Sequence, residues 1–199
     1  MEFLYRAPGR PSHIAILPGA FNPVTVAHMA LARAALPRVD QVLFALPRKF
    51  PHKEYAGAGF DQRASLLLAL TAGTANFSSA CTDGGLFIDI ARECRVEYGG
   101  DIRVSFLCGR DAAERIVGWD YGVPGAIGKM LGEFGLLVAA RHGEYTPPAE
   151  LAHAIGCLEL DAEFDDVSAS EVRRRIADGC AWEHLVPAAV RDLVRDLYR

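Results

Sequence analysis

The chain has 199 residues, of which 51% are hydrophobic and 23% charged, and its formal net charge is −4. This size and composition fit one globular domain with a sizeable core, and the mild acidity argues against a nucleic-acid-binding or membrane-surface protein. Five widely spaced cysteines without a C-x-x-C pair favour buried thiols over a zinc site. Without an apolar run of signal-peptide or bilayer-spanning length, the sequence predicts a cytoplasmic protein.

Short apolar runs alternate along the chain with stretches of helical periodicity. After an irregular lead-in over residues 1–12, these runs predict strands over residues 14–17, 41–46, 77–81, 103–108 and 134–140. Helical patterns cover residues 25–36, 61–72, 87–94, 111–117, 168–179 and a last stretch containing Val190, Leu193, Val194 and Leu197. Strands that alternate with helices predict an α/β fold: a single domain over residues 1–199, with a doubly wound parallel, Rossmann-like sheet and helices on both faces.

In such a sheet, ligands bind beyond the carboxyl ends of the strands, where the strand order reverses. The segments that follow the predicted strands are therefore the candidate site: residues 19–28, 47–53, 109–111 and 141–142. These segments contain glycines, basic residues and one aspartate, a composition suited to a phosphate ligand.

The first of these segments joins a buried strand to a helix N-terminus. The turn between them contains Pro18, Gly19, Asn22 and Pro23, and Thr25 is a plausible N-cap. Main-chain N–H groups and the positive end of the helix dipole then face the same space, which makes an anion site. Thr25 and His28 are three residues apart, so both side chains project from the first helical turn.

A second helix N-terminus follows near the other end of the chain, in the run Val-Ser-Ala-Ser-Glu-Val-Arg over residues 167–173. Ser168 and Glu171 form a capping box, which by itself is typical of a well-capped surface helix. The same turn also offers amides, the hydroxyls of Ser168 and Ser170, and the guanidinium of Arg173, and these groups would suit a triphosphate.

The two segments resemble the paired signatures of the nucleotidylyltransferase superfamily. The run Pro-Gly-Ala-Phe-Asn-Pro-x-Thr-x-x-His over residues 18–28 is similar to G-x-F-x-P followed by [H/T]-x-G-H, and residues 167–173 are similar to I-S-S-[ST]-x-[IV]-R. Asn22, Ala27 and Ala169 depart from the usual aspartate, glycine and serine. Both signatures in the expected order, about 140 residues apart, make a specific joint match.

Three shorter stretches resemble the bacterial nicotinate mononucleotide adenylyltransferase branch of that superfamily. They are Pro51-His52-Lys53 with Arg48 nearby, Gly109-Arg110-Asp111 followed by Trp119, and Leu185-Val186-Pro187. The resemblance implies that Asp111 contacts a ribose and that Trp119 lies against a pyridine ring. Residues 85–89 read Gly-Leu-Phe-Ile-Asp where the branch has S-Y-T-I-D, so an apolar pair could line a different acceptor pocket.

The resemblance implies an adenylyltransferase, in which a phosphate monoester attacks the α-phosphorus of ATP and pyrophosphate leaves. His28 would donate to a phosphate oxygen, with Thr25 and the amides of Gly19, Ala20 and Phe21 beside it. Ser168, Ser170 and Arg173 would hold the β- and γ-phosphates, while Gly109 and Asp111 would contribute to nucleotide binding. Lys53 and Arg48 would neutralise the triphosphate or the acceptor phosphate, and Mg²⁺ would arrive with ATP, since the sequence has no carboxylate cluster to hold it.

Two alternatives stay open. A threonine at the [H/T] position, as Thr25 is here, is also typical of phosphopantetheine adenylyltransferases. The chain length and the segment from Gly109 to Trp119 favour a pyridine nucleotide instead. A non-catalytic nucleotide-binding module would account for the departures at Asn22, Ala27 and Ala169. The sequence does not distinguish ATP from CTP, and a homo-oligomer remains possible, with the last helix more simply a core-packing helix than a dimer face.

Overall fold

The computed structural model describes residues 1–49, 57–140 and 145–199, and its strands form one sheet in the order β1-β4-β3-β2-β5-β6-β7. The strands are β1 (Glu2–Tyr5), β2 (His13–Pro18), β3 (Gln41–Pro47), β4 (Phe77–Thr82), β5 (Arg103–Gly109), β6 (Gly135–Ala139) and β7 (Ile155–Leu158). All neighbouring strands are parallel except β1, which runs antiparallel to β4 at one edge.

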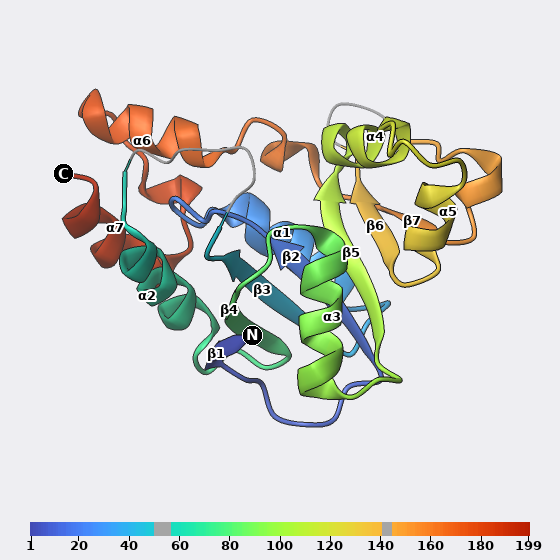
Figure 1. Cartoon of the computed structure of the whole chain (residues 1–199). Coiled ribbons are helices and arrows are strands. Elements are labelled where there is room, and N and C mark those ends of the chain that lie inside the picture. The colour runs from blue at the N-terminus through green and yellow to red at the C-terminus, as the bar shows by residue number, and fades with distance from the viewer. Residues whose placement is uncertain (50–56, 141–144) are drawn as a thin grey trace.

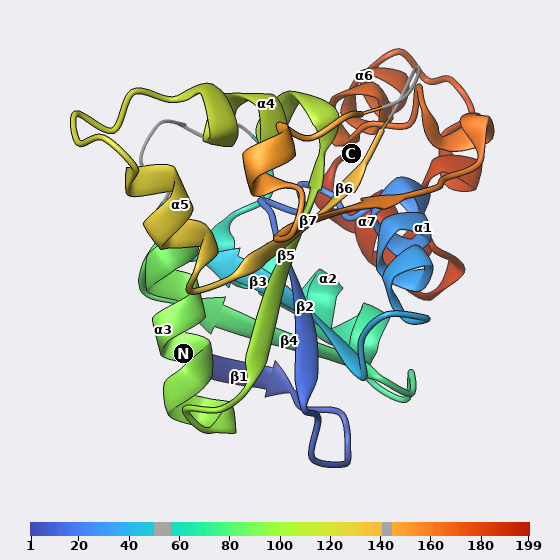
Figure 2. The same ribbon diagram turned by 90° about the vertical axis from the view of Figure 1, so that its right-hand side faces the viewer.

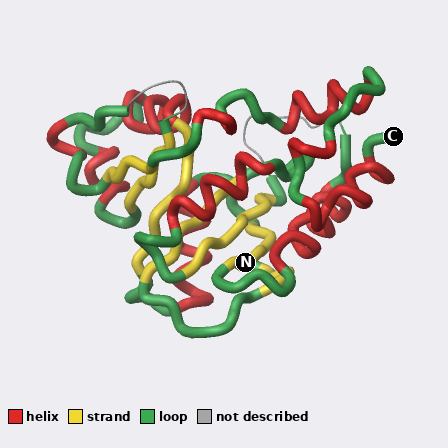
Figure 3. Tube along the Cα trace, turned by 180° about the vertical axis from the view of Figure 1, so that it is seen from behind, coloured by secondary structure: helices red, strands yellow, loops and turns green. Residues whose placement is uncertain are grey.

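Helices cover both faces of this sheet (Figures 1 and 2). The helices are α1 (Val26–Ala35), α2 (Phe60–Thr71), α3 (Phe87–Tyr98), α4 (Arg110–Gly118), α5 (Ala126–Leu131), α6 (Ala169–Ala177) and α7 (Arg191–Leu197). The buried side chains of α1, α2, α6 and α7 belong to one core cluster, and those of α3, α4 and α5 belong to the other. The view from behind in Figure 3 shows the strands enclosed between these two helical layers. The predicted α/β sheet with helices on both faces is confirmed.

Strand β2 shows why this sheet needs both layers. Its alternate side chains enter different cores: Ala15 and Leu17 pack on the α1 side, while Ile14 and Ile16 pack under α3 and its neighbours. All four side chains are buried, so neither face of the strand can be left to solvent. A continuous apolar run, rather than an alternating one, is what a strand covered on both faces requires.

The strand order reverses between β2 and β5. The chain goes from β2 to β3 and β4 in one direction, then returns so that β5 pairs with β2, with Ile16 opposite Phe106. The turn after β2 leads into α1, and the end of β5 leads directly into α4, so both helices begin beside this switch point. The fold therefore places the two segments where a doubly wound sheet binds ligands.

Several elements differ from the sequence prediction. The predicted irregular lead-in over residues 1–12 is wrong for Glu2–Tyr5, which form β1 and pair with β4, with Glu2 opposite Cys81, while residues 6–12 lie outside helices and strands. The partner of this strand lies far along the chain, so local periodicity does not reveal it. The short elements α5 and β7 were not predicted either, since six and four residues are too few for a clear pattern. Within the described ranges, no helix is long and apolar enough to cross a membrane. The single domain stays a prediction.

Candidate active site

The turn after β2 is built around a phenylalanine that folds back on a glycine. Phe21 has a positive φ of 48°, and its ring is almost completely buried. A Cβ atom at Gly19 would lie only 3.0 Å from Cζ of that ring. The G-x-F spacing therefore has a steric reason, because any side chain at position 19 would press on the Phe21 ring.

The backbone of this turn is tied to the sheet and to α2. The Gly19 N–H donates to the Ala45 carbonyl at 3.0 Å, which continues the contact between β2 and β3. The Gly19 amide is thus committed to the sheet, and the amides of Ala20 and Phe21 are the better candidates for a phosphate. Nη1 of Arg63, a buried residue of α2, donates to the Ala20 carbonyl at 2.9 Å.

Thr25 and His28 form a reciprocal arrangement at the start of α1. Nδ1 of His28 accepts the Thr25 N–H at 3.0 Å and lies 2.7 Å from the Thr25 hydroxyl oxygen. Because a main-chain N–H can only donate, Nδ1 must be the unprotonated nitrogen, and the neutral ring carries its proton on Nε2. His28 takes the place that Glu or Gln has in a capping box, and this arrangement sets both its orientation and its tautomer.

The His28 ring also rests on an aromatic support. The ring centroids of His28 and Phe21 are 5.3 Å apart at an interplanar angle of 61°, and Phe21 lies 5.9 Å from the ring of Phe44 in β3. Both phenylalanines are buried, so the imidazole is held against the core rather than on a mobile surface.

Arg173 joins α6 to the same turn. Its Nη1 donates to the main-chain oxygen of Asn22, and its Nη2 lies 3.2 Å from the Ser170 hydroxyl. Ser168 is the N-cap of α6, where its hydroxyl accepts the Glu171 N–H at 3.1 Å. The capping box of the sequence is therefore present on its serine side, and α6 presents its N-terminus next to the turn that leads into α1 (Figure 1).

The segment after β5 supplies a separate group of candidate residues. Gly109 is the N-cap of α4 and Asp111 lies exposed in its first turn. Trp119, the residue after α4, is 65% exposed and lines one open depression with Asp111. The structure thus brings these two predicted residues together. Helix α4 packs on the opposite face of the sheet from α6 (Figure 2).

The basic residues predicted after β3 are less directly placed. Arg48 forms ion pairs with Glu2 and with Asp83, the latter at 3.5 Å, and its guanidinium lies over the Phe60 ring. Its charge is therefore balanced by two carboxylates at the β1–β4 edge, and its role toward an acceptor stays a prediction. Lys53 lies outside the described residues.

The departure at residues 85–87 has a structural explanation. The Phe87 ring stacks on Phe106 of β5, with centroids 4.2 Å apart and an angle of 14°, and it meets Phe134 edge-on. Phe87 thus helps to fill the core beneath α3, while Leu86 is 54% exposed. Only Leu86 of this apolar pair presents a large surface to a ligand.

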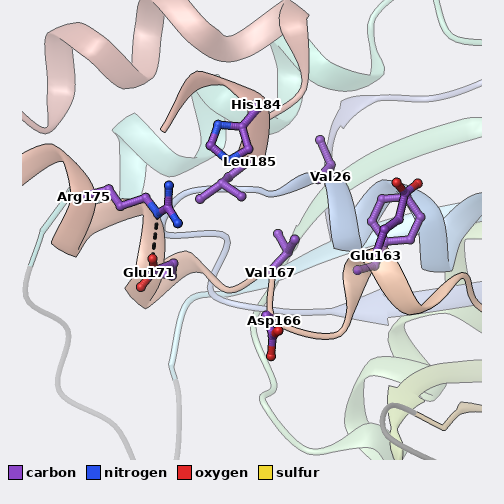
Figure 4. Close-up of a pocket in the computed structure, with 9 residues that line it drawn as sticks. Val26, Glu163, Asp166, Val167, Glu171, Arg175, His184 and Leu185 are labelled. Atoms are coloured by element: carbon purple, nitrogen blue, oxygen red, sulfur yellow. Dashed lines mark hydrogen bonds and ion pairs between the residues drawn. The ribbon is translucent and has the colours of Figure 1, made fainter. Parts of the chain in front are cut away.

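A groove lies beside α6, between the segments that carry the two motifs (Figure 4). Val26, Phe164, Val167 and Leu185 supply its apolar lining, and its polar lining is Glu163, Asp166, Glu171, Arg175 and His184. Glu171 forms ion pairs with Arg174 at 2.8 Å and with Arg175 at 2.6 Å. Hydrogen bonds from these two arginines lower the pKa of Glu171 to about 2, so its carboxylate is ionised and paired with both arginines at neutral pH.

The chemistry of the turn suits phosphate rather than a metal ion. Among the described residues, no three or more His, Cys, Asp or Glu side chains gather in a way that could hold a cation. The groups that do gather, namely amides, hydroxyls, an imidazole and a guanidinium, are donors to anionic oxygen.

Arg63 and Tyr198 contact the turn but were not among the predicted site residues. Arg63 shares the buried face of α2 with Leu66, Leu67 and Leu70, so a cation on an apolar helix face was the available signal. Tyr198 follows α7, and its hydroxyl donates to Oδ1 of Asn22. A single aromatic residue after a short helix gives no comparable signal.

A sequence profile described as cytidylyltransferase-like matches residues 16–175, which is most of the chain and includes both motifs. The chain belongs to the cytidylyltransferase-like family. The predicted superfamily resemblance is thereby confirmed.

Two relatives match this chain over nearly their whole length. The chain is 28% identical to a probable nicotinate-nucleotide adenylyltransferase of Moorella thermoacetica, with 96% of this chain and 93% of the relative covered. It is 29% identical to a protein of the same description from Gloeobacter violaceus, with 93% and 95% covered.

Two solved structures have the same fold as this chain. A Plasmodium falciparum nicotinic acid mononucleotide adenylyltransferase complexed with NaAD matches with a TM-score of 0.71 at 15% identity, covering 93% of this chain and 95% of the other. The same enzyme complexed with APC matches with a TM-score of 0.70 at 16% identity, covering 94% and 97%.

Proposed function

We propose that this cytidylyltransferase-like protein is a nicotinate-nucleotide adenylyltransferase, which transfers the AMP part of ATP to nicotinate mononucleotide and releases pyrophosphate in NAD biosynthesis. The observation that carries the proposal is the contact of Arg173 with the turn that contains Phe21 and leads into α1, the helix of His28. It joins the two family motifs at one edge of the sheet. The choice of nicotinate mononucleotide as the acceptor rests on the relatives, which are named probable nicotinate-nucleotide adenylyltransferases.

In this reaction an oxygen of the acceptor phosphate attacks the α-phosphorus of ATP, and the bond to the β-phosphate oxygen breaks. The nucleophile is already anionic, so the protein needs no general base and forms no covalent intermediate. Catalysis then rests on alignment of the two phosphates and on stabilisation of charge at the reacting phosphorus.

The residues of the turn and of α1 bind one part of the triphosphate in this proposal, and those of α6 bind another. Nε2–H of His28 donates to an oxygen of the α-phosphate as negative charge develops there, while Thr25 holds the ring in the donating tautomer. The amides of Ala20 and Phe21 bind the same phosphate group. Arg173 and the hydroxyls of Ser168 and Ser170 bind the β- and γ-phosphates of the leaving group.

The acceptor occupies the α4 side of the site in this proposal. Asp111 binds a ribose hydroxyl, and the exposed face of Trp119 stacks on the pyridine ring. The lysine and arginine after β3, Lys53 and Arg48, neutralise phosphate charge. Leu86 replaces a polar contact of the usual acceptor pocket with an apolar one.

The residues at two departures from the motifs are accommodated by this site. Ala27 is buried and belongs to the core cluster on the α1 side, so its methyl group packs inside the protein. Asn22 is also buried, and its side-chain oxygen accepts the Ala58 N–H at 3.2 Å, a role that either an amide or a carboxylate can fill.

Mg²⁺ enters this proposal with ATP. The donor groups of the turn fit the oxygens of a triphosphate, and the ion would be coordinated by those oxygens and by water. When bound, it neutralises charge on the phosphates and so eases departure of pyrophosphate.

The test is an assay of pyrophosphate and dinucleotide formation with the purified full chain. Mg·ATP is supplied with nicotinate mononucleotide, nicotinamide mononucleotide or phosphopantetheine, one at a time, and CTP is then tested in place of ATP. We expect release with nicotinate mononucleotide and ATP, together with the corresponding dinucleotide. Release with phosphopantetheine alone would overturn the acceptor, and ATP binding without release for any acceptor would indicate a non-catalytic module.

A further inference from the structure

The end of the chain reaches the turn between β2 and α1. The hydroxyl of Tyr198, one residue beyond α7, donates to Oδ1 of Asn22, which lies 176 positions earlier. The same oxygen accepts the Ala58 N–H. An amide oxygen has two lone pairs, so both acceptor positions of Asn22 Oδ1 are used.

Tyr198 is held firmly enough to act on the turn. The side chains of Val190 and Val194 are fully buried in the core that also contains α1 and α2, and the Tyr198 N–H donates to the Val194 carbonyl at 3.1 Å. Burial of the Tyr198 ring raises the pKa of its hydroxyl, so the group stays protonated and acts as a donor. Figure 1 shows α7 packed beside α2, on the side of the sheet from which α6 also approaches.

Asn22 therefore receives contacts from three distant parts of the chain. Arg173 of α6 donates to its main-chain oxygen, Ala58 donates to its side chain from the segment before α2, and Tyr198 donates to its side chain from the C-terminus. Asn22 follows directly after Phe21, which supports the His28 ring. A shift of Asn22 would thus move both the amides of the turn and the position of the Arg173 head group.

We propose that Tyr198 is a positioning residue of the active site, which holds the turn over residues 18–23 in its phosphate-binding conformation through the side chain of Asn22. This inference rests on the proposed function for its kinetic part. It assigns to the C-terminal segment a role in nucleotide binding beyond its packing against the core.

The test is Tyr198→Phe, which removes the hydroxyl and keeps the ring, with Tyr98→Phe as the matched control. Tyr98 is a half-buried tyrosine at the end of α3, on the other face of the sheet, where its ring meets Phe3 edge-on and lies under the Arg6 guanidinium. We expect Tyr198→Phe to raise KM for ATP and lower kcat/KM roughly three- to tenfold, the worth of one hydrogen bond. KM for the acceptor should change less, and Tyr98→Phe should leave both values unchanged.

Hydrogen exchange supplies a readout that does not depend on the reaction. Amides over residues 18–25 should exchange faster in Tyr198→Phe than in the wild type, measured without ligand and well below the unfolding temperature of either protein. Asn22→Asp, which keeps oxygen acceptors for both donors, should retain the slow exchange.

The outcomes separate this inference from the function on which it rests. If the wild type releases no pyrophosphate with any acceptor, the proposed function fails. Independently of activity, unchanged hydrogen exchange in Tyr198→Phe would show that the Tyr198 hydroxyl does not hold the turn in place. If the wild type is active and Tyr198→Phe has wild-type kcat/KM for ATP, the positioning role is wrong, whatever the exchange shows.

Discussion

Arg173 reaches from α6 to the turn that precedes α1, where its Nη1 donates to the main-chain oxygen of Asn22, 151 positions earlier in the chain. The contact brings the N-termini of two helices to one turn. Each terminus contributes main-chain amides and a positive dipole end, so their convergence concentrates donors for a polyanion at one edge of the sheet.

Replacement of Arg173 tests this convergence. Arg173→Lys keeps the charge, but its single nitrogen does not reproduce the geometry in which Nη1 meets Asn22 and Nη2 meets Ser170. We expect kcat/KM for ATP to fall about 10- to 100-fold, the cost of one or two charge-assisted hydrogen bonds. Arg174→Lys is the control, since Arg174 pairs with Glu171 and Asp178 on the exposed side of α6. Equal losses in both variants would refute a specific role of Arg173.

His28→Ala removes the donor that we place at the α-phosphate. We expect kcat to fall about 10²- to 10³-fold, as for loss of one preorganised donor, with a smaller change in KM for ATP. The unfolding temperature should fall by only about 2–4 °C, because the variant loses one capping contact and one ring contact of a half-buried side chain. His153→Ala, at an exposed site outside the turn, should retain full activity. A His28→Ala enzyme with wild-type kcat would remove His28 from the mechanism.

Gly57 tests whether the turn tolerates crowding. Its φ is +108°, and a Cβ there would lie 3.0 Å from Oδ1 of Asn22 and 3.4 Å from Cδ of Arg173. Gly99 has nearly the same φ, +106°, but a Cβ there would meet nothing within 4 Å. Both alanine variants should lose roughly 1–2 kcal/mol of unfolding free energy from backbone strain. Only Gly57→Ala should also raise KM for ATP, and steady-state kinetics beside denaturant titrations of both variants would show the difference.

The ion pairs of Glu171 predict a pH dependence of stability. Because the hydrogen bonds from Arg174 and Arg175 lower its pKa from 4.5 to about 2, the folded state binds a proton at this group less readily than the unfolded state. The stabilisation is complete above pH 4.5 and is lost as the pH falls toward 2. Wild type should therefore unfold at a higher temperature than Glu171→Gln at pH 7, and the gap should close toward pH 2.

The control for that measurement is Glu150→Gln, which removes one exposed carboxylate outside α6. If the gap between Glu171→Gln and wild type is the same at pH 7 and pH 2, or if Glu150→Gln behaves identically to Glu171→Gln, then the ion pairs on α6 do not stabilise the protein.

Much of the site could be predicted from short-range patterns. The strand, turn and helix over residues 13–36 are specified by neighbouring residues: an apolar run, two prolines with a glycine, and a threonine N-cap. The second capping box is equally local, since Ser168 and Glu171 are three residues apart. The carboxyl ends of the strands, where a ligand was expected, carry the segments of both helix N-termini, because parallel strands end together.

The pairing of β1 with β4 could not be predicted in the same way. Its four residues have no clear alternation, and their place depends on the edge of β4, a strand far along the chain. The hydrogen bonds of Tyr198 with Asn22 and of Arg63 with Ala20 could not be predicted either, because they also join residues far apart in the chain.

Residue order alone thus specified which groups the two helix N-termini would offer, because caps, turns and periodicity depend on neighbours a few positions apart. It did not specify that a guanidinium, a phenol and the backbone of residue 58 would all converge on Asn22. Those contacts join residues 36 to 176 positions apart. They exist because the packing of α2, α6 and α7 on one face of the sheet brings distant donors to a single buried side chain and its carbonyl.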